Sequence, residues 1–373
     1  MVRSLERRLD VEVPVRTEVV SRSRVLIVAD FSASKLGNAS VAEQLAAKLR
    51  ASGDQVIATS DKTNRWLRAS DMVASAIRYR HAVDVAIIDV YSGAAFRWAE
   101  WATSIVRSAG TPVIHVLRGG NLPKFAAANP DRVKRLFGLS NAVVALSGFL
   151  YEEMAPYGPI AEVIPNPLEA GAYPFRRRST ATPEMVWLRS FNTIYNPTLG
   201  PRVLAEVAAV YPATSPVGAR LTMIGSDQGD GSLQSTEAVA TELGIRDQLV
   251  LKGRVPKADV PQHLSKGDIF INTTDVDNVP ITVLEAMACG LCVVTTDVGG
   301  LPYLLADGVD ALLVPRDDPK AMANAVLRII EEPGLADRLS NNGRAKAESF
   351  DWSKVLPRWR SLIANVAVHG ERR

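Results

Sequence analysis

Short runs of aliphatic and β-branched residues alternate with helical stretches, such as residues 41–53, along most of the chain. In the first half these runs predict six strands, at residues 24–30, 54–59, 83–89, 112–117, 142–146 and 161–165. Strands that alternate with helices are typical of parallel sheets connected by crossover helices. The pattern therefore predicts an α/β domain with a doubly wound sheet.

The second half of the chain repeats this pattern. Its six predicted strands cover residues 185–190, 219–226, 247–253, 268–273, 292–296 and 311–315. Between the two sets, residues 163–184 are rich in proline, arginine and small residues and lack periodicity, which favours an interdomain linker. Ligands of doubly wound sheets bind at the carboxyl ends of the strands, so we expect the binding site in the cleft between two facing sheets.

The last segment of the chain has apolar residues at helical spacing. We expect it to form a helix with Pro357 near its first turns. The predicted organisation is an N-terminal domain over residues 1–167, a C-terminal domain over residues 168–350, and a terminal helix over residues 351–373. The apolar positions of that helix are Trp352, Leu356, Trp359, Leu362 and Ile363.

The composition agrees with a folded two-domain protein. The chain has 373 residues, of which 47% are hydrophobic and 22% charged, so it can bury a large core. No apolar run approaches the ~20 residues that a membrane-spanning helix needs. The first 24 residues alternate charged with single apolar residues, which is unlike a secretory signal, and we expect a cytoplasmic protein.

Charge is distributed unevenly along the chain. Residues 1–150 contain 21 Lys+Arg against 13 Asp+Glu, whereas residues 151–350 contain 17 against 25. A basic half that faces an acidic half suits closure over a charged ligand, and a basic outer face also suits peripheral contact with the anionic inner face of a membrane. The alternative, that surface charge merely varies along the chain, stays open.

Two features could indicate a metal site, and neither has the expected context. Cys289 and Cys292 have no second pair of thiols or nearby histidine to complete a zinc site, which favours buried thiols. The sequence from Asp275 to Asp277 reads Asp-Val-Asp, but it leads directly into a helix instead of following an early strand. We expect no metal ligands and no cofactor.

A helix that begins near Val279 and ends at Gly290 follows these aspartates. Its first turn would present free backbone amides and a partial positive charge to the cleft, where a diphosphate could bind. Glu285, two turns into the helix, could address a pair of hydroxyl groups. Residues 298–302 read VGGLP and add a second glycine-rich turn.

The segment 277–290, together with VVTTDVGG at 293–300 and the stretch 311–333, resembles the retaining GT-B glycosyltransferases of family four. The resemblance extends to VIPNP in the linker, IGSD at 224–227, LKGRV at 251–255 and FDWSKV near the end. It implies two Rossmann-like domains that face a cleft, the first on the acceptor side and the second binding the nucleotide sugar. It also implies a terminal helix that crosses back onto the first domain.

The resemblance also implies roles for charged residues. The family has two glutamates with seven residues between them, which here are Asp277, expected at the hydroxyls of the transferred sugar, and Glu285, expected at the nucleotide ribose. An alternative is that Asp277 only caps the helix. The family's diphosphate-binding arginine corresponds to Arg189, unless this side chain only pairs with a core carboxylate, and the lysine that usually follows is replaced by residues 194–196, which leaves Asn196 as a weaker candidate.

Further positions are expected around the donor. Gly253 and Arg254 correspond to the family's loop near the nucleobase, and Gly225 is placed to let the phosphate or the sugar approach, although either glycine could form an ordinary turn. The backbone expected at the diphosphate belongs to Val279, Pro280, Ile281 and Thr282.

The first domain departs more from the family. Where relatives carry paired glycines after the first strand, this chain retains Gly37 with Asn38. Where relatives place a histidine near the anomeric carbon, this chain has Arg118, followed by Gly119, Gly120 and Asn121. His115 lies inside the preceding strand, and we expect it to be structural.

The predicted function is transfer of a hexose-type sugar, with retention at the anomeric carbon, from a nucleotide-diphosphate sugar as co-substrate to a glycan, lipid-linked or small-molecule acceptor. The alternative is a catalytically degenerate subunit that binds nucleotide sugar or glycan and acts as a scaffold for a partner enzyme. An oxidoreductase is disfavoured because no G-x-G-x-x-G follows a strand. Nucleic-acid binding is disfavoured because no known module is present.

Overall fold

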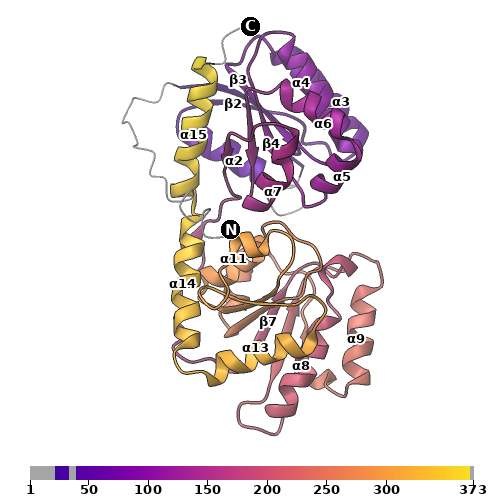
Figure 1. Cartoon of the computed structure of the whole chain (residues 1–373), viewed down its shortest axis with the longest axis vertical. Helices are drawn as coiled ribbons and strands as arrows, with labels where there is room; N and C mark the ends of the chain where they lie inside the picture. Colours follow the sequence, from indigo (N-terminus) through magenta and orange to yellow (C-terminus); the bar gives the residue numbers. More distant parts are fainter. Residues whose placement is uncertain (1–21, 33–38, 370–373) are drawn as a thin grey trace.

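The computed structural model describes residues 22–32 and 39–369 of the chain. These residues form two α/β domains, drawn one above the other in Figure 1. Each domain contains a parallel sheet of six strands, and each strand overlaps one of the twelve runs predicted from the sequence. The doubly wound fold predicted from the alternation of strands and helices is therefore confirmed.

The N-terminal sheet has the strand order β2-β1-β3-β4-β5-β6. Parallel pairing sets Val25 of β1 opposite Val56 of β2 on one side and opposite Val85 of β3 on the other. The strands are almost entirely apolar because helices cover both faces of the sheet. Their bounds are β1 Arg24–Val28, β2 Gln55–Ala58, β3 Val85–Val90, β4 Val113–Leu117, β5 Ala142–Ala145 and β6 Glu162–Val163.

The helices of this domain follow the strands in the expected way. The first of them has a capping box, in which Ser40 and Glu43 satisfy each other's backbone amides. The bounds of the helices are α2 Val41–Ala51, α3 Arg65–Tyr79, α4 Ala94–Arg107, α5 Leu122–Ala128, α6 Pro130–Gly138 and α7 Gly148–Met154. Helices α3 and α4 pack against each other.

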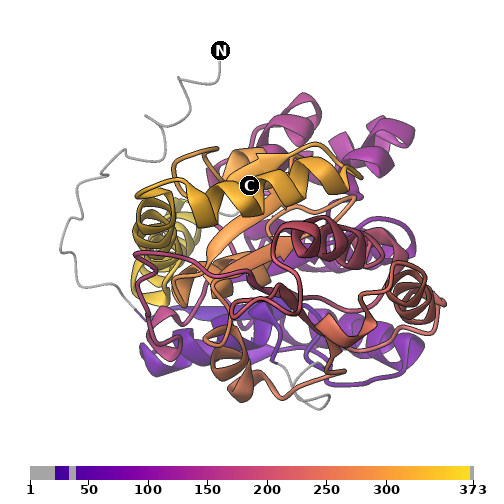
Figure 2. The same ribbon diagram turned by 90° about the horizontal axis from the view of Figure 1, so that it is seen from below.

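The C-terminal sheet has the strand order β12-β11-β10-β7-β8-β9. Seen from below, its strands lie between helices (Figure 2). The predicted strand at 247–253 is shorter in the structure because Arg246–Gln248 form a 3₁₀ turn before it. The bounds are β7 Glu184–Leu188, β8 Arg220–Ile224, β9 Leu249–Leu251, β10 Ile269–Asn272, β11 Cys292–Thr296 and β12 Leu312–Val314.

The helices of the C-terminal domain include the one predicted after the aspartates. It covers Ile281–Ala288, and Gly290 beyond its end has a φ of 80°, a left-handed conformation that favours glycine. The bounds are α8 Leu199–Val210, α9 Ser232–Glu242, α10 Val260–Leu264, α11 Ile281–Ala288, α12 Leu301–Leu304, α13 Pro319–Glu331 and α14 Leu335–Ser349, with 3₁₀ turns η5 Thr193–Tyr195 and η7 Lys257–Asp259.

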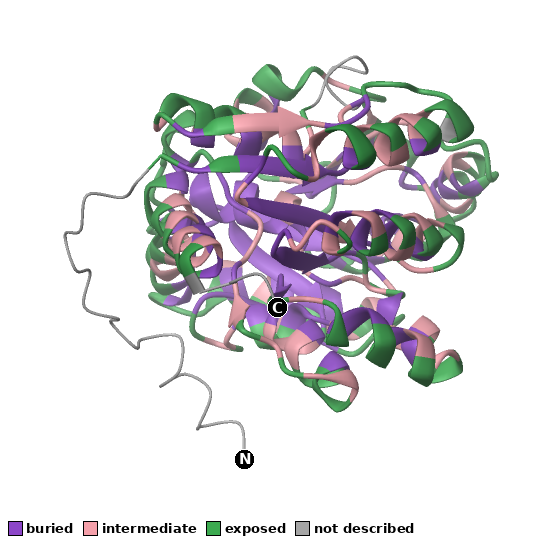
Figure 3. Cartoon of the chain, turned by 90° about the horizontal axis from the view of Figure 1, so that it is seen from above, coloured by how far each residue is buried: buried purple, intermediate pink, exposed green. Residues whose placement is uncertain are grey.

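The last helix, α15 (Trp352–His369), belongs to the core of the N-terminal domain, as the sequence predicted. In Figure 1 it runs along the upper domain, whereas α14 runs along the lower one. The side chains of Trp352, Trp359 and Ile363 on its apolar side are buried in the core of that domain. Figure 3 shows the same distribution for the whole chain, with buried strands inside and exposed positions on the outer sides of the helices.

The chain crosses between the domains twice, and the two crossings touch. The backbone N–H of Leu168 donates to the carbonyl of Phe350 at 2.8 Å, and the N–H of Trp352 donates to the carbonyl of Leu168 at 3.2 Å. The Asp351 carboxylate also accepts from the backbone of Ala170 at 2.9 Å. The two segments that connect the domains are thus hydrogen-bonded to each other. Any rotation of one domain against the other must take place about this point.

In both sheets the strand order reverses at one point. The reversal lies between β1 and β3 in the first sheet and between β7 and β10 in the second. At such a point the loops that leave neighbouring strands go to opposite faces, which opens a crevice at the carboxyl edge.

Among the described residues, none of the helices combines the length and the hydrophobicity that crossing a bilayer requires.

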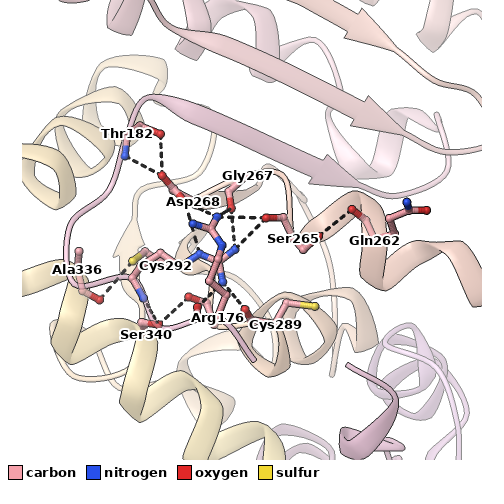
Figure 4. A network of polar contacts seen from close by, with 12 residues as sticks. Arg176, Thr182, Gln262, Ser265, Gly267, Asp268, Cys289, Cys292, Ala336 and Ser340 are labelled. Carbon is pink, nitrogen blue, oxygen red and sulfur yellow. Dashed lines mark hydrogen bonds and ion pairs between the residues drawn. The ribbon is translucent and has the colours of Figure 1, made fainter. Parts of the chain in front are cut away.

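A buried arginine holds the far end of α11. The Arg178 side chain is fully buried and donates to the carbonyl oxygens of Gly267, at 2.7 Å, and of Cys289, and it lies 3.5 Å from the Asp268 carboxylate. Figure 4 shows Gly267, Asp268 and Cys289 gathered at this point. Arg178 anchors the Cys289 carbonyl at the C-terminal end of α11. This fixes the direction of the helix, whose N-terminal end points toward the cleft.

We predict that Arg178→Met destabilises the chain by about 1–3 kcal/mol, because it removes the buried guanidinium that donates to the carbonyl oxygens of Gly267 and Cys289, while Arg176 keeps its ion pair with Asp268. Arg177→Met is the matched control. Arg177 pairs with Asp337 at the surface, so its loss should hardly change the unfolding midpoint. Urea unfolding followed by circular dichroism measures both variants, and equal midpoints for the two would contradict the anchoring role.

Candidate active site

A cleft with a volume of about 760 Å³ lies between the domains, at the carboxyl edges of both sheets. It therefore occupies the place that the sequence predicted for the site. The N-terminal domain contributes Asp30, Ser40, Val41, Ala42, Asp89, Tyr91, Ser92, Arg118, Gly119, Gly120, Asn121, Leu146 and Asn166. The C-terminal domain contributes Ile194, Tyr195, Val276, Asp277, Asn278 and Val279.

Arg189 and Asp277 form an ion pair at the reversal of the C-terminal sheet. Arg189 follows β7 and Asp277 lies in the loop after β10, so the fold brings together residues that are 88 positions apart. The two side chains are only 14% and 13% exposed. Burial lowers the pKa of the Arg189 guanidinium, which also lies 4.2 Å from the ring centre of Tyr195. Asp277 lines the cleft, whereas Arg189 is not among the residues that line it, and Tyr195 does line it.

Asp277 does not cap α11. Its carboxylate accepts from the backbone N–H of Asn278 at 2.8 Å, and no side chain caps the helix at Pro280. The first turn of α11 therefore keeps its N-terminal amides for another partner. The hydroxyl oxygen of Thr282 is also buried and has no hydrogen-bond partner within the part of the chain that the structure describes.

The turn at Gly299 and Gly300 holds the Asp277 loop. The N–H of Gly300 donates to the Asp277 carbonyl at 3.0 Å. A Cβ atom would lie 2.1 Å from the Asp277 carbonyl oxygen at Gly299 and 2.0 Å from the Asn278 carbonyl oxygen at Gly300. Both positions therefore require glycine, and the turn positions the loop through its backbone.

Glu285 is buried on α11, with only 1% of its side chain exposed, and it pairs with Lys257 of η7. The Lys257 ammonium also lies 6.0 Å from the ring centre of Tyr173. Burial, followed by the charge of Glu285, raises the pKa of Tyr173. Neither Glu285 nor Lys257 is among the residues that line the cleft.

Gly225 and Gly253 lie side by side, because the N–H of Gly225 donates to the carbonyl of Gly253 at 2.9 Å. A Cβ atom at Gly225 would lie 1.6 Å from the carbonyl oxygen of Arg189. Gly225 therefore allows the strand ends that carry Arg189 to pack, which is a structural reason for this glycine. Gly253 has a φ of 64° with open space beside it, and Arg254 follows it in the same loop.

On the opposite wall, Arg118 is paired with Asp89 at 3.0 Å, and both side chains are 8% exposed. Arg118 also donates to the Asn166 side chain at 2.9 Å. Burial opposes the charge on Arg118, but the neighbouring Asp89 carboxylate raises its pKa overall. Burial and the charge of Asp89 raise the pKa of Tyr91 to about 12, so its phenol stays protonated at neutral pH.

The two walls approach each other closely. A Cβ atom at Gly120 would lie 3.9 Å from the backbone carbon of Asp277. The Ser147 hydroxyl donates to the Asn278 side-chain oxygen across the cleft, and the Tyr303 hydroxyl donates to Glu152 at 2.7 Å. Ser147 caps α7 and Glu152 lies on it, so these two hydrogen bonds join α7 to the C-terminal domain.

Other predicted positions are placed as follows. Gly37 and Asn38 lie outside the described residues. Asn196 donates to Asp317 at 3.1 Å and is not among the residues that line the cleft. Asp275 pairs with Arg316 at 3.2 Å.

The residues interpreted as structural are buried. His115 bonds to the Thr103 hydroxyl at 2.8 Å, and burial lowers its pKa to about 3. Cys289 and Cys292 are both buried free thiols. Burial raises their pKa values to about 11 and about 12, which makes both thiols poor nucleophiles at neutral pH.

Sequence reasoning missed Lys257, Asp89 and Tyr91. Lys257 stands two residues after the LKGRV motif, and a cation so close to the expected nucleobase loop was the available signal. Asp89 and Tyr91 lie at the carboxyl end of β3, beside the reversal in the N-terminal sheet, where polar residues favour a ligand site.

The comparisons agree with this geometry. Residues 193–346 match the family described as Glycosyl transferases group 1. D-inositol 3-phosphate glycosyltransferases are similar in sequence: that of Streptosporangium roseum is 29% identical over 178 residues, and that of Frankia alni is 30% identical over 181 residues. Each match covers 46% of this chain, and it covers 41% of the first relative and 44% of the second, so the chain spans less than half the length of these relatives.

Solved structures share the fold. Sucrose-phosphate synthase from Thermosynechococcus elongatus superposes with a TM-score of 0.72 at 16% identity, covering 93% of this chain and 100% of that one. HepE from Anabaena in complex with UDP and glucose superposes with a TM-score of 0.69 at 16% identity, covering 92% and 100%. The resemblance predicted from the sequence is thus confirmed: residues 193–346 match the group 1 glycosyltransferases, and the chain has the GT-B fold.

Proposed function

We propose that this chain is a retaining glycosyltransferase that moves a hexose from a nucleotide-diphosphate sugar to an acceptor bound on the N-terminal domain. The observation that carries the proposal is the ion pair of Arg189 with Asp277, a cleft-lining residue, beside the uncapped end of α11. A cation, a helix N-terminus and a carboxylate in one desolvated place match a diphosphate joined to a polyhydroxyl group.

In the proposed complex, the diphosphate lies against the amides of the first turn of α11 and the Arg189 guanidinium. Asp277 accepts hydrogen bonds from sugar hydroxyls, and Glu285 accepts them from the ribose. The loop at Gly253 and Arg254 lies at the base. HepE, which shares the fold, has been solved with UDP and with UDP-glucose, and this favours a uridine donor here.

In the proposed reaction, the bond between the anomeric carbon and the diphosphate oxygen breaks, and the acceptor oxygen bonds to the same face of that carbon. The acceptor proton passes to the departing diphosphate. Negative charge grows on the diphosphate as the bond breaks, and Arg189 and the α11 amides stabilise it. Closure of the cleft would exclude water and so limit hydrolysis of the donor.

The donor must exchange partners with two ion pairs. Arg189 holds Asp277 and Lys257 holds Glu285, so each acid assigned to the donor already carries a cation. When the ribose takes Glu285, Lys257 is released, and its half-exposed chain leaves it free to reach the diphosphate. We propose that Lys257 in this way replaces the lysine that the family places after the first strand of the second domain.

The acceptor would bind on the wall formed by Tyr91, Arg118 and the turn from Gly119 to Asn121. Tyr91 offers a hydroxyl that donates and accepts. Arg118 is held by Asp89 and Asn166, so it would orient an acceptor without moving. A glycan, a lipid-linked sugar and a small polyol all fit this description, and the related enzymes named after D-inositol 3-phosphate favour a polyol phosphate.

One observation favours a degenerate subunit that binds a nucleotide sugar without turnover. Both donor acids are neutralised by a cation of the same chain, and a pair that never opens would block the ribose or the sugar. Such a subunit would act as a scaffold for a partner enzyme.

Turnover separates the two candidates. Incubated with a panel of nucleotide sugars, the purified chain should slowly release nucleoside diphosphate from one of them, and a suitable acceptor should accelerate the release. Arg189→Gln should slow this release by about 100-fold or more, because it removes a charged donor to the leaving group. Binding of a nucleotide sugar with no release under any acceptor would instead support the degenerate subunit.

Glu285→Gln tests the assignment of the ribose. Hydrogen bonds to a charged group contribute about 1.5–3 kcal/mol, so the affinity for UDP should fall about 10- to 100-fold. Titration calorimetry measures the affinity, and Glu242→Gln on exposed α9 is the control. Unchanged UDP binding by Glu285→Gln would refute the ribose role.

Lys257→Ala tests the cation exchange through the sign of its effect. If Lys257 moves to the diphosphate, its removal should weaken UDP binding about tenfold, and Lys257→Arg should restore most of the affinity. If Lys257 only competes for Glu285, its removal should strengthen binding. Lys266→Ala, an exposed lysine nearby in the chain, is the control and should bind UDP normally.

A further inference from the structure

A group of large apolar side chains lies exposed on the N-terminal domain, apart from the cleft residues. It comprises Trp66 and Leu67 in the first turn of α3 and Trp101 on α4, together with the half-buried Trp98 of α4 that lies between the two exposed rings. Trp66, Leu67 and Trp101 are 64%, 60% and 52% exposed. We call these four side chains the tryptophan surface. Single exposed apolar residues are normal, but a contiguous group that includes two highly exposed tryptophans marks an interaction surface.

The tryptophan surface is held in shape. The side-chain oxygen of Asn64 caps α3 and accepts from the backbone N–H groups of Trp66 at 2.9 Å and Leu67 at 3.3 Å. Ring centres lie 6.1 Å apart between Trp66 and Trp98 and 5.0 Å apart between Trp98 and Trp101, and both pairs meet edge to face. The ring of Trp98 therefore connects the exposed rings of Trp66 and Trp101 across two helices.

The surroundings of this surface are basic. Residues 61–140, which form the layer of α3 to α6 with strands β3 and β4, contain 12 Lys+Arg against 6 Asp+Glu. Two of the six acids are paired, Glu100 with Arg132 and Asp89 with Arg118. These two carboxylates therefore add no unpaired negative charge to the surface. Figure 1 shows α3, α4, α5 and α6 on the same side of the upper domain. Exposed cations of this layer are Arg78, Arg97, Lys124, Lys134 and Arg135.

We propose that the tryptophan surface and these cations bind an anionic lipid bilayer. Tryptophan rings favour the boundary between headgroups and acyl chains, and each lysine or arginine near an anionic surface adds attraction. This combination fits a bilayer better than a second copy of the chain, because two copies of the same basic layer would repel each other.

The proposal also explains where the surface lies. Both α3 and α4 begin at the carboxyl edge of the N-terminal sheet, and Tyr91 and Ser92, just before α4, line the cleft. Contact with a bilayer through the tryptophan surface would set the acceptor side of the cleft near the headgroups. Binding itself does not depend on the proposed glycosyl transfer.

Co-sedimentation with vesicles tests the proposal with the full chain. Binding to phosphatidylcholine mixed with phosphatidylglycerol should exceed binding to phosphatidylcholine alone, and it should fall as salt rises. Trp66→Ser with Trp101→Ser should lower the partition coefficient at least tenfold and abolish quenching of protein fluorescence by brominated lipid. Arg97→Gln with Lys124→Gln and Lys134→Gln should lower binding to the anionic vesicles only.

Matched controls use exposed residues of the C-terminal domain. Val210→Ser with Val250→Ser removes exposed apolar groups, and Arg202→Gln with Lys320→Gln removes exposed charges; neither variant should change binding. Thermal melting confirms that each variant is folded. Equal binding to neutral and anionic vesicles, or equal binding by the tryptophan variant and the wild type, would overturn the proposal. So would a wild-type dimer in solution that the tryptophan variant splits, since the surface would then be a protein interface.

Discussion

The ion pair between Arg189 and Asp277 closes the crevice that the reversal of strand order opens between β7 and β10. Any doubly wound sheet leaves such a gap at its carboxyl edge, and the loops around it cannot satisfy each other through backbone hydrogen bonds alone. Two side chains of opposite charge fill the gap, and Asp277 lines the cleft that the N-terminal domain faces. The shape and the electrostatics of the cleft depend on this pair, because it positions both the loop after β10 and the first turn of α11.

The site is neutral before a donor arrives. Asp277, Glu285 and Asp89 each have a cation of their own, supplied by Arg189, Lys257 and Arg118. Burying an unpaired charge costs far more than exchanging one partner for another, so a site of this kind can remain folded when empty and still accept a charged ligand. The Lys257 side chain is 48% exposed and the Arg118 side chain 8%. Moving Lys257 away from its acid therefore costs less free energy than moving Arg118.

Much of the fold was predictable because each strand is a short apolar run bounded by polar residues, and each run needs only local periodicity to be recognised. The convergence of Arg189, Asp277 and Glu285 came from resemblance to a family and not from spacing. What could not be predicted depends on tertiary contact. Gly225 is required by the carbonyl of Arg189, and the pairing of Lys257 with Glu285 joins two loops whose distance the sequence does not reveal.

A crystal structure of the chain with bound UDP tests the central assignment most directly. The account predicts that the ribose hydroxyls lie within hydrogen-bond distance of the Glu285 carboxylate, that the diphosphate lies against the first turn of α11 and Arg189, and that the Lys257 ammonium has left Glu285 for a phosphate oxygen. A nucleotide bound elsewhere, with the Lys257 and Arg189 ion pairs intact, would contradict it.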